Sequence, residues 1–279
     1  MKTVKLNNGV EMPQMGYGVY QVSESECERC VSDALKVGYR MIDTAQAYHN
    51  EESVGNAVKK SGIDRKEIFL VSKIWISNYG YEKAKASIDE SLRKLQTDYI
   101  DLMLLHQPFC DRYGAYRALE EAYKEGKLRA IGVSNFYSDH FIDIASNMDV
   151  VPAVNQVETN PFHQQIEAET FMKGKGVQIE SWAPFAEGKN DLFRNETLAA
   201  IADKYHKSIA QVVLRWLIQR NVVVIPKSIR KERIVENFNV FDFELTKEDM
   251  EKIAALDTKT SCFFSHRDPK MVEWLGGLH

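Results

Sequence analysis

The sequence predicts an α/β fold, a (β/α)8 TIM barrel, and three observations support this prediction. Short apolar segments alternate with amphipathic helical segments, the alternation repeats eight times along the chain, and the apolar segments contain almost no polar residue. Strands that are apolar on both faces are typical of parallel sheets covered by helices. Eight strand-helix units are the number that closes such a sheet into a barrel. We therefore expect a single domain over residues 1–279.

An N-terminal hairpin is expected first, because Asn8 and Gly9 separate two short apolar runs within residues 4–13. The first barrel strand is expected at residues 15–20, and its helix begins at a capping box of Ser23 and Glu26 and reaches residue 36. The following units, each given as strand and then helix, are expected at residues 40–44 and 51–60, 68–73 and 81–94, 99–106 and 113–124, 129–134 and 138–147, 153–157 and 165–173, 177–182 with two helices at 196–205 and 209–219, and 222–225 with 231–238.

The chain continues beyond the eighth unit with an extra C-terminal helix and loop. Thr246 and Asp249 cap a helix that reaches residue 256, in the way that Ser208 and Gln211 cap the helix at 209–219. Residues 262–274 are rich in aromatic side chains but show no periodicity, which predicts a loop folded over something apolar. Such a loop either seals one end of the barrel or contacts the substrate.

Composition excludes several classes of function. The net charge is −4 with both signs interspersed, so no overall field attracts nucleic acid or an anionic membrane. No apolar run has the length of a signal peptide core or a bilayer span, and we expect a cytoplasmic protein without a membrane partner. Cys27 and Cys30 form a C-x-x-C spacing inside an expected helix with no second pair, so we expect no metal site.

Ionisable side chains end three successive strands. Asp43 lies at the end of the strand at 40–44 with Tyr48 just beyond it, Lys73 ends the strand at 68–73, and His106 ends the strand at 99–106. The carboxyl ends of barrel strands form one rim, where barrels place their chemistry. The pattern therefore predicts a carboxylate, a phenol, an ammonium group and an imidazole at one rim.

A lysine at a strand end can be a Schiff-base nucleophile, a phosphate ligand or an electrostatic tuner. A nearby Asp43 keeps Lys73 charged, which makes it a poor nucleophile but lowers the pKa of the Tyr48 phenol from about 10. Tyr48 is then the expected proton donor to a carbonyl oxygen as hydride reaches the carbon. His106 is expected to hydrogen-bond and orient the same oxygen.

The order and spacing of these four residues resemble the aldo-keto reductase family, from about residue 4 to beyond residue 237. The resemblance implies NADPH-dependent reduction of an aldehyde or ketone to an alcohol by a catalytic tetrad of Asp43, Tyr48, Lys73 and His106. It also implies a small-molecule carbonyl substrate and a monomer or weak oligomer. A Rossmann fingerprint is absent, because the segment at 16–18 lacks the third glycine, and the family holds its extended cofactor across the barrel mouth instead.

The resemblance also implies which residues hold the cofactor. Ser134, Asn135 and Gln156 match the positions that hold the nicotinamide carboxamide, and Trp182 matches the aromatic position that stacks on the nicotinamide ring. The segment at 180–185 adds two further contacts, and the motif after the eighth strand takes the adenosine 2′-phosphate and the adenine, which implies a preference for NADP. These remaining residues are Pro184 and Phe185 beside Trp182, Lys227, Ser228 and Arg233 at the 2′-phosphate, and Glu236 and Asn237 at the adenine.

Departures from the family pattern concern the substrate pocket. Gln107 follows His106 where Trp is usual, Tyr20 stands where Trp is frequent, and Asn160 precedes Pro161 where His is common. These exchanges predict a pocket that is more polar than in mammalian aldehyde-reducing members. The expected walls are Tyr20, Trp75, Gln107, Phe109 and Trp274.

Two other functions compete with carbonyl reduction. The first is a barrel aldolase that uses Lys73 as a Schiff base, and Asp43 disfavours it because it keeps the lysine protonated. The second is a nicotinamide-binding regulatory subunit without turnover, and the intact tetrad disfavours it.

Overall fold

Eight parallel strands close into the predicted barrel in the computed structural model, which describes residues 2–278. The sheet closes where Met15 pairs with Val224 and the Gly16 amide donates to the Val224 carbonyl at 2.8 Å. Neighbours in sequence are neighbours in the sheet throughout. The strands are β3 (Tyr17–Gly18), β4 (Met41–Asp43), β5 (Phe69–Ile74), β6 (Leu102–Leu105), β7 (Ile131–Ser134), β8 (Val154–Glu158), β9 (Gln178–Trp182) and β10 (Val223–Val224).

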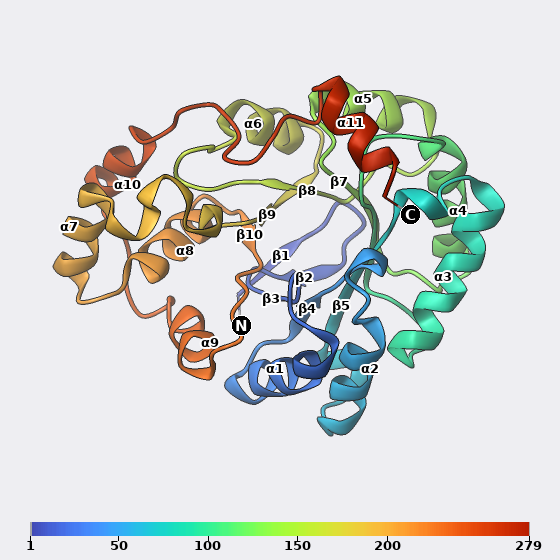
Figure 1. The fold of residues 1–279 in the computed structure, drawn as a ribbon, viewed down its shortest axis with the longest axis horizontal. Coiled ribbons are helices and arrows are strands. Elements are labelled where there is room, and N and C mark those ends of the chain that lie inside the picture. Colours follow the sequence, from blue (N-terminus) through green and yellow to red (C-terminus); the bar gives the residue numbers. More distant parts are fainter. Residues whose placement is uncertain (1, 279) are drawn as a thin grey trace.

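Helices surround the strands on the outside of the barrel (Figure 1). Five of them, α2, α5, α7, α8 and α9, have the bounds that the sequence predicts. The helices that follow the eight strands are α1 (Glu24–Val37), α2 (Glu51–Lys60), α3 (Tyr81–Leu95), α4 (Arg112–Lys124), α5 (Ser138–Asn147), α6 (Ile166–Gly174), α7 (Glu196–Tyr205), α8 (Ile209–Gln219) and α9 (Lys231–Phe238).

The predicted capping boxes have different outcomes. The box of Ser208 and its partner opens α8, and a second box opens α10 (Lys247–Ala254), as predicted. The box at α1 is wrong, because the Ser23 hydroxyl pairs with Ser25 at 3.2 Å and Arg29 donates to the Glu26 carboxylate at 3.1 Å. Arg29, one turn later, binds the Glu26 carboxylate, which is the side chain that the capping box requires.

The barrel interior is filled by apolar side chains and closed at its amino end by the predicted hairpin, β1 (Thr3–Lys5) and β2 (Glu11–Pro13). Met12 of the hairpin is fully buried in this interior cluster. Figure 1 shows the hairpin in the centre of the ring of strands. Four of these interior side chains come from four different strands. They are Met41 of β4, Val71 of β5, Leu104 of β6 and Val154 of β8.

Each of these four residues is followed two positions later by a polar side chain. Because side chains alternate between the two faces of a strand, residues i and i+2 lie on the same face. The polar side chains therefore form the next interior layer toward the carboxyl rim. They are Asp43, Lys73, His106 and Gln156.

The C-terminal segment contains a helix that the sequence analysis did not predict. Residues 262–274 are expected to form a loop, but α11 (Pro269–Gly276) occupies part of it. Asp268 caps this helix by accepting from the Lys270 amide at 3.0 Å, and Pro269 holds its first position. Eight residues are too few for a clear apolar periodicity. No helix within residues 2–278 is long and apolar enough to cross a bilayer.

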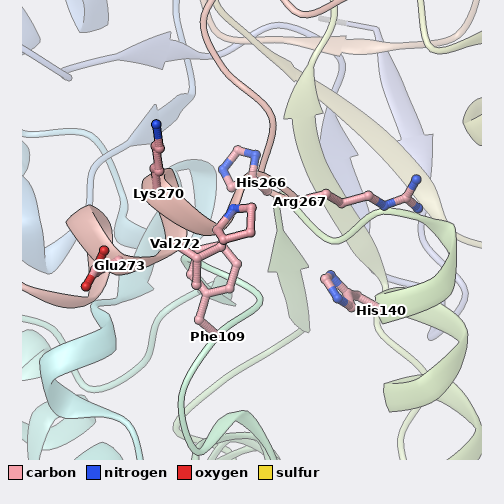
Figure 2. Close-up of a pocket in the computed structure, with 8 residues that line it drawn as sticks. Phe109, His140, His266, Arg267, Lys270, Val272 and Glu273 are labelled. Carbon is pink, nitrogen blue, oxygen red and sulfur yellow. The ribbon is translucent and has the colours of Figure 1, made fainter.

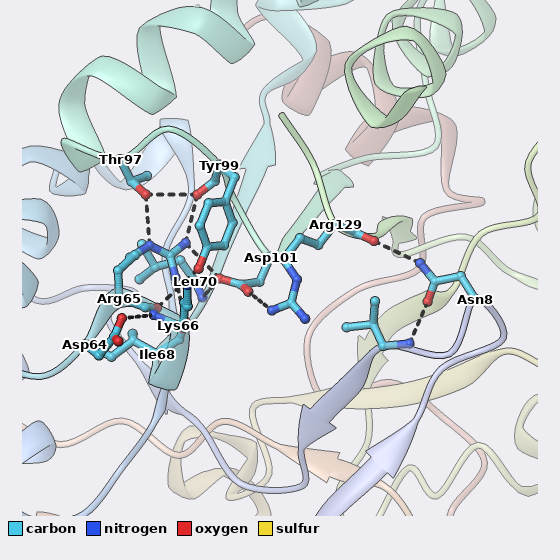
Figure 3. A network of polar contacts seen from close by, with 11 residues as sticks. Asn8, Asp64, Arg65, Lys66, Ile68, Leu70, Thr97, Tyr99, Asp101 and Arg129 are labelled. Carbon is cyan, nitrogen blue, oxygen red and sulfur yellow. Dashed lines mark hydrogen bonds and ion pairs between the residues drawn. The ribbon is translucent and has the colours of Figure 1, made fainter. Parts of the chain in front are cut away.

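A buried carboxylate ties together the amino ends of neighbouring strands (Figure 3). Asp101 is fully buried and accepts from Arg65 Nη2 at 2.8 Å, the Leu70 amide at 2.9 Å and Arg129 Nη1 at 2.6 Å. Asn8 of the hairpin donates to the Arg129 carbonyl at 2.9 Å. The network thus joins the hairpin to the amino ends of β5, β6 and β7.

We predict that Asp101→Asn lowers the free energy of unfolding by about 2 kcal/mol, because it puts an amide group against donors and leaves two guanidinium groups without their anion. The value lies below that for a wholly buried pair, since the Arg65 and Arg129 side chains are 21% and 42% exposed. Denaturant unfolding measures the loss. Asp98→Asn at an exposed position is the matched control, and equal midpoints for the two variants would contradict the role of the network.

Candidate active site

The structure brings the four ionisable residues of the predicted tetrad together at the carboxyl rim. Lys73 Nζ donates to Asp43 Oδ1 at 2.6 Å, to the Thr44 carbonyl at 2.9 Å and to Tyr48 Oη at 3.2 Å. Tyr48 reaches this position from a single 3-10 turn (Gln46–Tyr48) directly after β4. Its ring lies edge-on to His106, with 5.6 Å between the ring centroids.

Lys73 carries its charge at neutral pH. Burial lowers the pKa of the ammonium group, but the Asp43 carboxylate and the Tyr48 phenol outweigh burial and raise the pKa above its usual value. The lysine side chain is fully buried, so its charge is balanced by the carboxylate rather than by solvent. A protonated lysine is not a Schiff-base nucleophile.

The Tyr48 phenol departs from the sequence-based expectation of a lowered pKa. Burial raises the pKa of Tyr48 to about 12, and the Lys73 ammonium group lowers it only in part. Desolvation penalises the phenolate more than one neighbouring cation favours it. Tyr48 therefore keeps its proton at neutral pH, as a proton donor must.

His106 is uncharged at the same rim. Burial lowers the pKa of the imidazole well below its usual value, and the charge of Lys73 and the nearby His266 lower it further. The Trp75 ring packs edge-on against the imidazole at 5.0 Å. A neutral imidazole can still donate one hydrogen bond to an oxygen atom.

A cavity of about 930 Å³ opens over these residues. Lys73 lies beneath it, whereas the other three members of the tetrad line it. Most of the residues predicted to contact cofactor or substrate also line it, namely Tyr20, Trp75, Gln107, Ser134, Asn135, Gln156, Trp182, Pro184, Phe185, Lys227, Arg233 and Trp274.

A hydrogen-bonded chain connects the tetrad to Trp182. Asn135 Nδ2 donates to the His106 carbonyl at 3.1 Å, and Trp182 Nε1 donates to Asn135 Oδ1 at 2.8 Å. Asn135 adopts the left-handed backbone conformation with φ of 64°, which asparagine tolerates better than most residues. The Asn135 amide thus links the Trp182 indole to the main chain of His106.

The donor set of the cavity fits an extended, anionic cofactor. Amides and a hydroxyl from β7 and β8 line one part, and Lys227 and Arg233 after β10 line another. Neither cation forms an ion pair with any residue in the range 2–278, so both can bind an anion such as a phosphate group. Gly18 also lines the cavity, and a Cβ there would lie 2.9 Å from the Ile225 carbonyl oxygen.

Some predicted site residues do not line this cavity. Ser228 accepts from Tyr17 Oη through its carbonyl at 2.6 Å, and Glu236 and Asn237 lie on α9 behind the motif. Phe109 was expected as a pocket wall but lies in a neighbouring surface hollow, where its ring stacks on His266 at 6.1 Å (Figure 2). Its packing against His266 of the C-terminal segment keeps Phe109 in this hollow rather than in the cavity over the tetrad.

The C-terminal segment supplies residues that the sequence analysis did not assign. Phe263 packs on Trp182 with 5.2 Å between ring centroids, and Trp75 Nε1 donates to the Leu278 carbonyl at 3.0 Å. This segment therefore lies over the rim that holds the tetrad, not at the amino end. Its further lining residues are Phe264, His266 and Leu275. The aromatic enrichment of residues 262–274 indicates that this segment covers an apolar surface, but the sequence does not show which end of the barrel it covers.

Comparisons with known proteins agree with this geometry. The model of the aldo/keto reductase family matches residues 9–258. The glyoxal reductase of Bacillus subtilis (strain 168) is 51% identical over 257 residues, 91% of this chain and 92% of that protein. The methylglyoxal reductase DkgA of Escherichia coli (strain K12) is 42% identical, over 91% of this chain and 93% of that protein.

Solved structures show the same fold. An aldo-keto reductase from a Medee basin deep-sea metagenome library has a TM-score of 0.93 and 45% identity, covering 95% of this chain and 98% of that one. The Bombyx mori aldo-keto reductase in complex with NADP has a TM-score of 0.89 and 31% identity, covering 94% and 95%. The chain belongs to the aldo/keto reductase family and is an NADPH-dependent reductase of aldehydes and ketones.

Proposed function

We propose that the tetrad of Asp43, Tyr48, Lys73 and His106 carries out the carbonyl reduction. The observation that carries this proposal is the position of Lys73 Nζ, 2.6 Å from Asp43 Oδ1 and 3.2 Å from Tyr48 Oη, directly below the cavity. A cation there favours the phenolate that forms when Tyr48 gives up its proton. Asp43 keeps that cation charged.

Tyr48 and His106 have different roles at the substrate oxygen. Tyr48, whose pKa of about 12 keeps it protonated, donates its proton to the oxygen as negative charge develops there. Neutral His106 donates a hydrogen bond to the same oxygen and orients the carbonyl group. NADPH, when bound, supplies the hydride that adds to the carbonyl carbon.

The cofactor contacts remain those implied by the family resemblance. Ser134, Asn135 and Gln156 would hold the nicotinamide carboxamide, and Trp182, Pro184 and Phe185 would bound the ring. Lys227 and Arg233 would take the 2′-phosphate, since both line the cavity and neither is ion-paired within residues 2–278. We assign Ser228, Glu236 and Asn237 to the adenosine end as well, although they stand just outside the lining.

We propose small aldehydes and ketones such as glyoxal and methylglyoxal as substrates. Relatives named glyoxal reductase and methylglyoxal reductase are 51% and 42% identical to this chain. The rings of Tyr20, Trp75 and Trp274 narrow the space above the tetrad, and Gln107 adds a polar group whose Oε1 has no protein partner within residues 2–278. A hydroxyl group on a small substrate could donate to that oxygen, and a second carbonyl group could accept from the amide nitrogen of the same side chain.

We further propose that the whole chain acts as one domain and as a monomer or weak oligomer. The strands of the barrel span residues 17–224, and the C-terminal segment packs over the carboxyl rim of the barrel, where Leu278 accepts from Trp75. The aldolase alternative is disfavoured because Lys73 is protonated. The regulatory alternative predicts no turnover and is tested by the assay below.

We predict that Tyr48→Phe lowers the rate of glyoxal reduction by at least about 100-fold, because it removes the proton donor and leaves the packing unchanged. NADPH affinity should stay within a few-fold. Steady-state turnover and a fluorescence titration measure the two quantities. Tyr20→Phe removes a hydroxyl from a ring 5.0 Å away and should keep most of the activity. Retained turnover in Tyr48→Phe would remove Tyr48 from the mechanism.

We predict that Arg233→Ala weakens NADPH binding by about 2 kcal/mol, or roughly 30-fold, while NADH binding hardly changes. The guanidinium group would lose a charge-assisted contact with a phosphate that NADH does not have. The loss should shrink as salt rises, because Arg233 is exposed.

Fluorescence titration with both cofactors measures this selectivity. Arg230→Ala is the matched control, since Arg230 is exposed on the same turn but does not line the cavity. Equal losses for NADPH and NADH would mean that Arg233 supports the fold rather than the phosphate site.

A further inference from the structure

Glu180 is a buried carboxyl group next to the tetrad that the proposed reduction does not use. It lies on β9 directly opposite Gln156 of β8 in the register of the sheet, and it is fully buried. Gln156 Nε2 donates to Glu180 Oε2 at 2.9 Å and to Asp43 Oδ2 at 2.9 Å. Glu180 Oε1 is buried without a hydrogen-bond partner within residues 2–278.

The two acceptors fix the direction of the Gln156 amide. An amide nitrogen carries two hydrogen atoms, and here each of them has its own carboxyl acceptor. The amide oxygen is therefore the group that remains for the cavity, which Gln156 lines. A reversed amide would place that oxygen against the Asp43 carboxylate and lose the hydrogen bond to Asp43 Oδ2 in a buried site.

The charge of the cluster is compatible with this arrangement. Burial raises the pKa of Glu180, the Asp43 carboxylate raises it as well, and Gln156 and Lys73 only partly oppose them. These shifts favour the neutral carboxyl group, and Glu180 Oε2 accepts from Gln156 in the neutral and in the ionised state.

We propose that Glu180 is a positioning residue for the cofactor: with Asp43 it holds the Gln156 amide so that only the amide oxygen faces the cavity. The subsite then selects a ligand group that donates a hydrogen bond, such as the amino group of a carboxamide. This inference rests on the proposed placement of the nicotinamide carboxamide at Gln156. Glu180 itself acts through Gln156 and contacts no ligand.

The test compares binding of NADP⁺ with that of its 3-acetylpyridine analogue, in which a methyl group replaces the carboxamide amino group. Wild-type protein should bind NADP⁺ more tightly, because only NADP⁺ donates to the Gln156 oxygen. Glu180→Met removes one acceptor at similar side-chain length and frees the amide to rotate. It should weaken NADP⁺ binding about fivefold and binding of the analogue by less than about twofold. Titration calorimetry measures both affinities without turnover.

Two variants separate positioning from general damage. Glu180→Gln retains a carbonyl acceptor and should restore the wild-type preference for NADP⁺ over the analogue. Glu120→Met removes a buried carboxyl on α4, which accepts from the Val150 amide at 2.7 Å, and should leave the preference unchanged.

The outcomes that would overturn the inference differ from those that would overturn the proposed function. A preference retained in Glu180→Met, or equal losses for both ligands, overturns the role of Glu180 alone. A wild-type protein without any preference overturns the placement of the carboxamide at Gln156, and the role of Glu180 with it. Neither result bears on Tyr48, whose role depends on turnover.

Discussion

Lys73 and Asp43 form an ion pair inside the barrel, and the remaining groups of the site are arranged around it. All three ammonium hydrogens have acceptors, namely Asp43 Oδ1 at 2.6 Å, the Thr44 carbonyl at 2.9 Å and Tyr48 Oη at 3.2 Å. Removing either ion would leave a buried charge without compensation, which typically costs about 3–5 kcal/mol. The pair therefore fixes the phenol as the third acceptor, at the edge where a substrate can reach it.

Burial shifts the groups around this pair toward their uncharged forms. Desolvation raises the pKa of Tyr48 to about 12, raises the pKa of Glu180, and lowers the pKa of His106. The Lys73–Asp43 pair therefore supplies the main fixed charges of the site. The conjugate base of the phenol is then favoured mainly by Lys73, whose ammonium group already lies within hydrogen-bond distance.

The barrel and its rim could be predicted from the sequence because both depend on local signals, namely the alternation of apolar and amphipathic segments and the polar residues at strand ends. The helix at 51–60 has its predicted bounds, and the positions of Asp43 and Lys73 at the ends of apolar strands predicted their place at the rim. Prediction from the sequence failed where contacts between distant segments decide. The direction of the Tyr48 pKa shift depends on how deeply the fold buries the phenol, and the position of Phe109 depends on its contact with His266, far away in the sequence. Glu180 was overlooked because its partner lies one strand away.

The charge of Lys73 is the central claim, and nitrogen-15 NMR of lysine side chains tests it most directly. The Lys73 Nζ resonance would be assigned by its absence from Lys73→Met. Because Asp43 and Tyr48 raise the pKa of Lys73 above its usual value, we predict an ammonium chemical shift that does not titrate between pH 6 and about 10. A resonance that changes to the neutral amine below about pH 8 would contradict the ion pair and reopen the Schiff-base alternative.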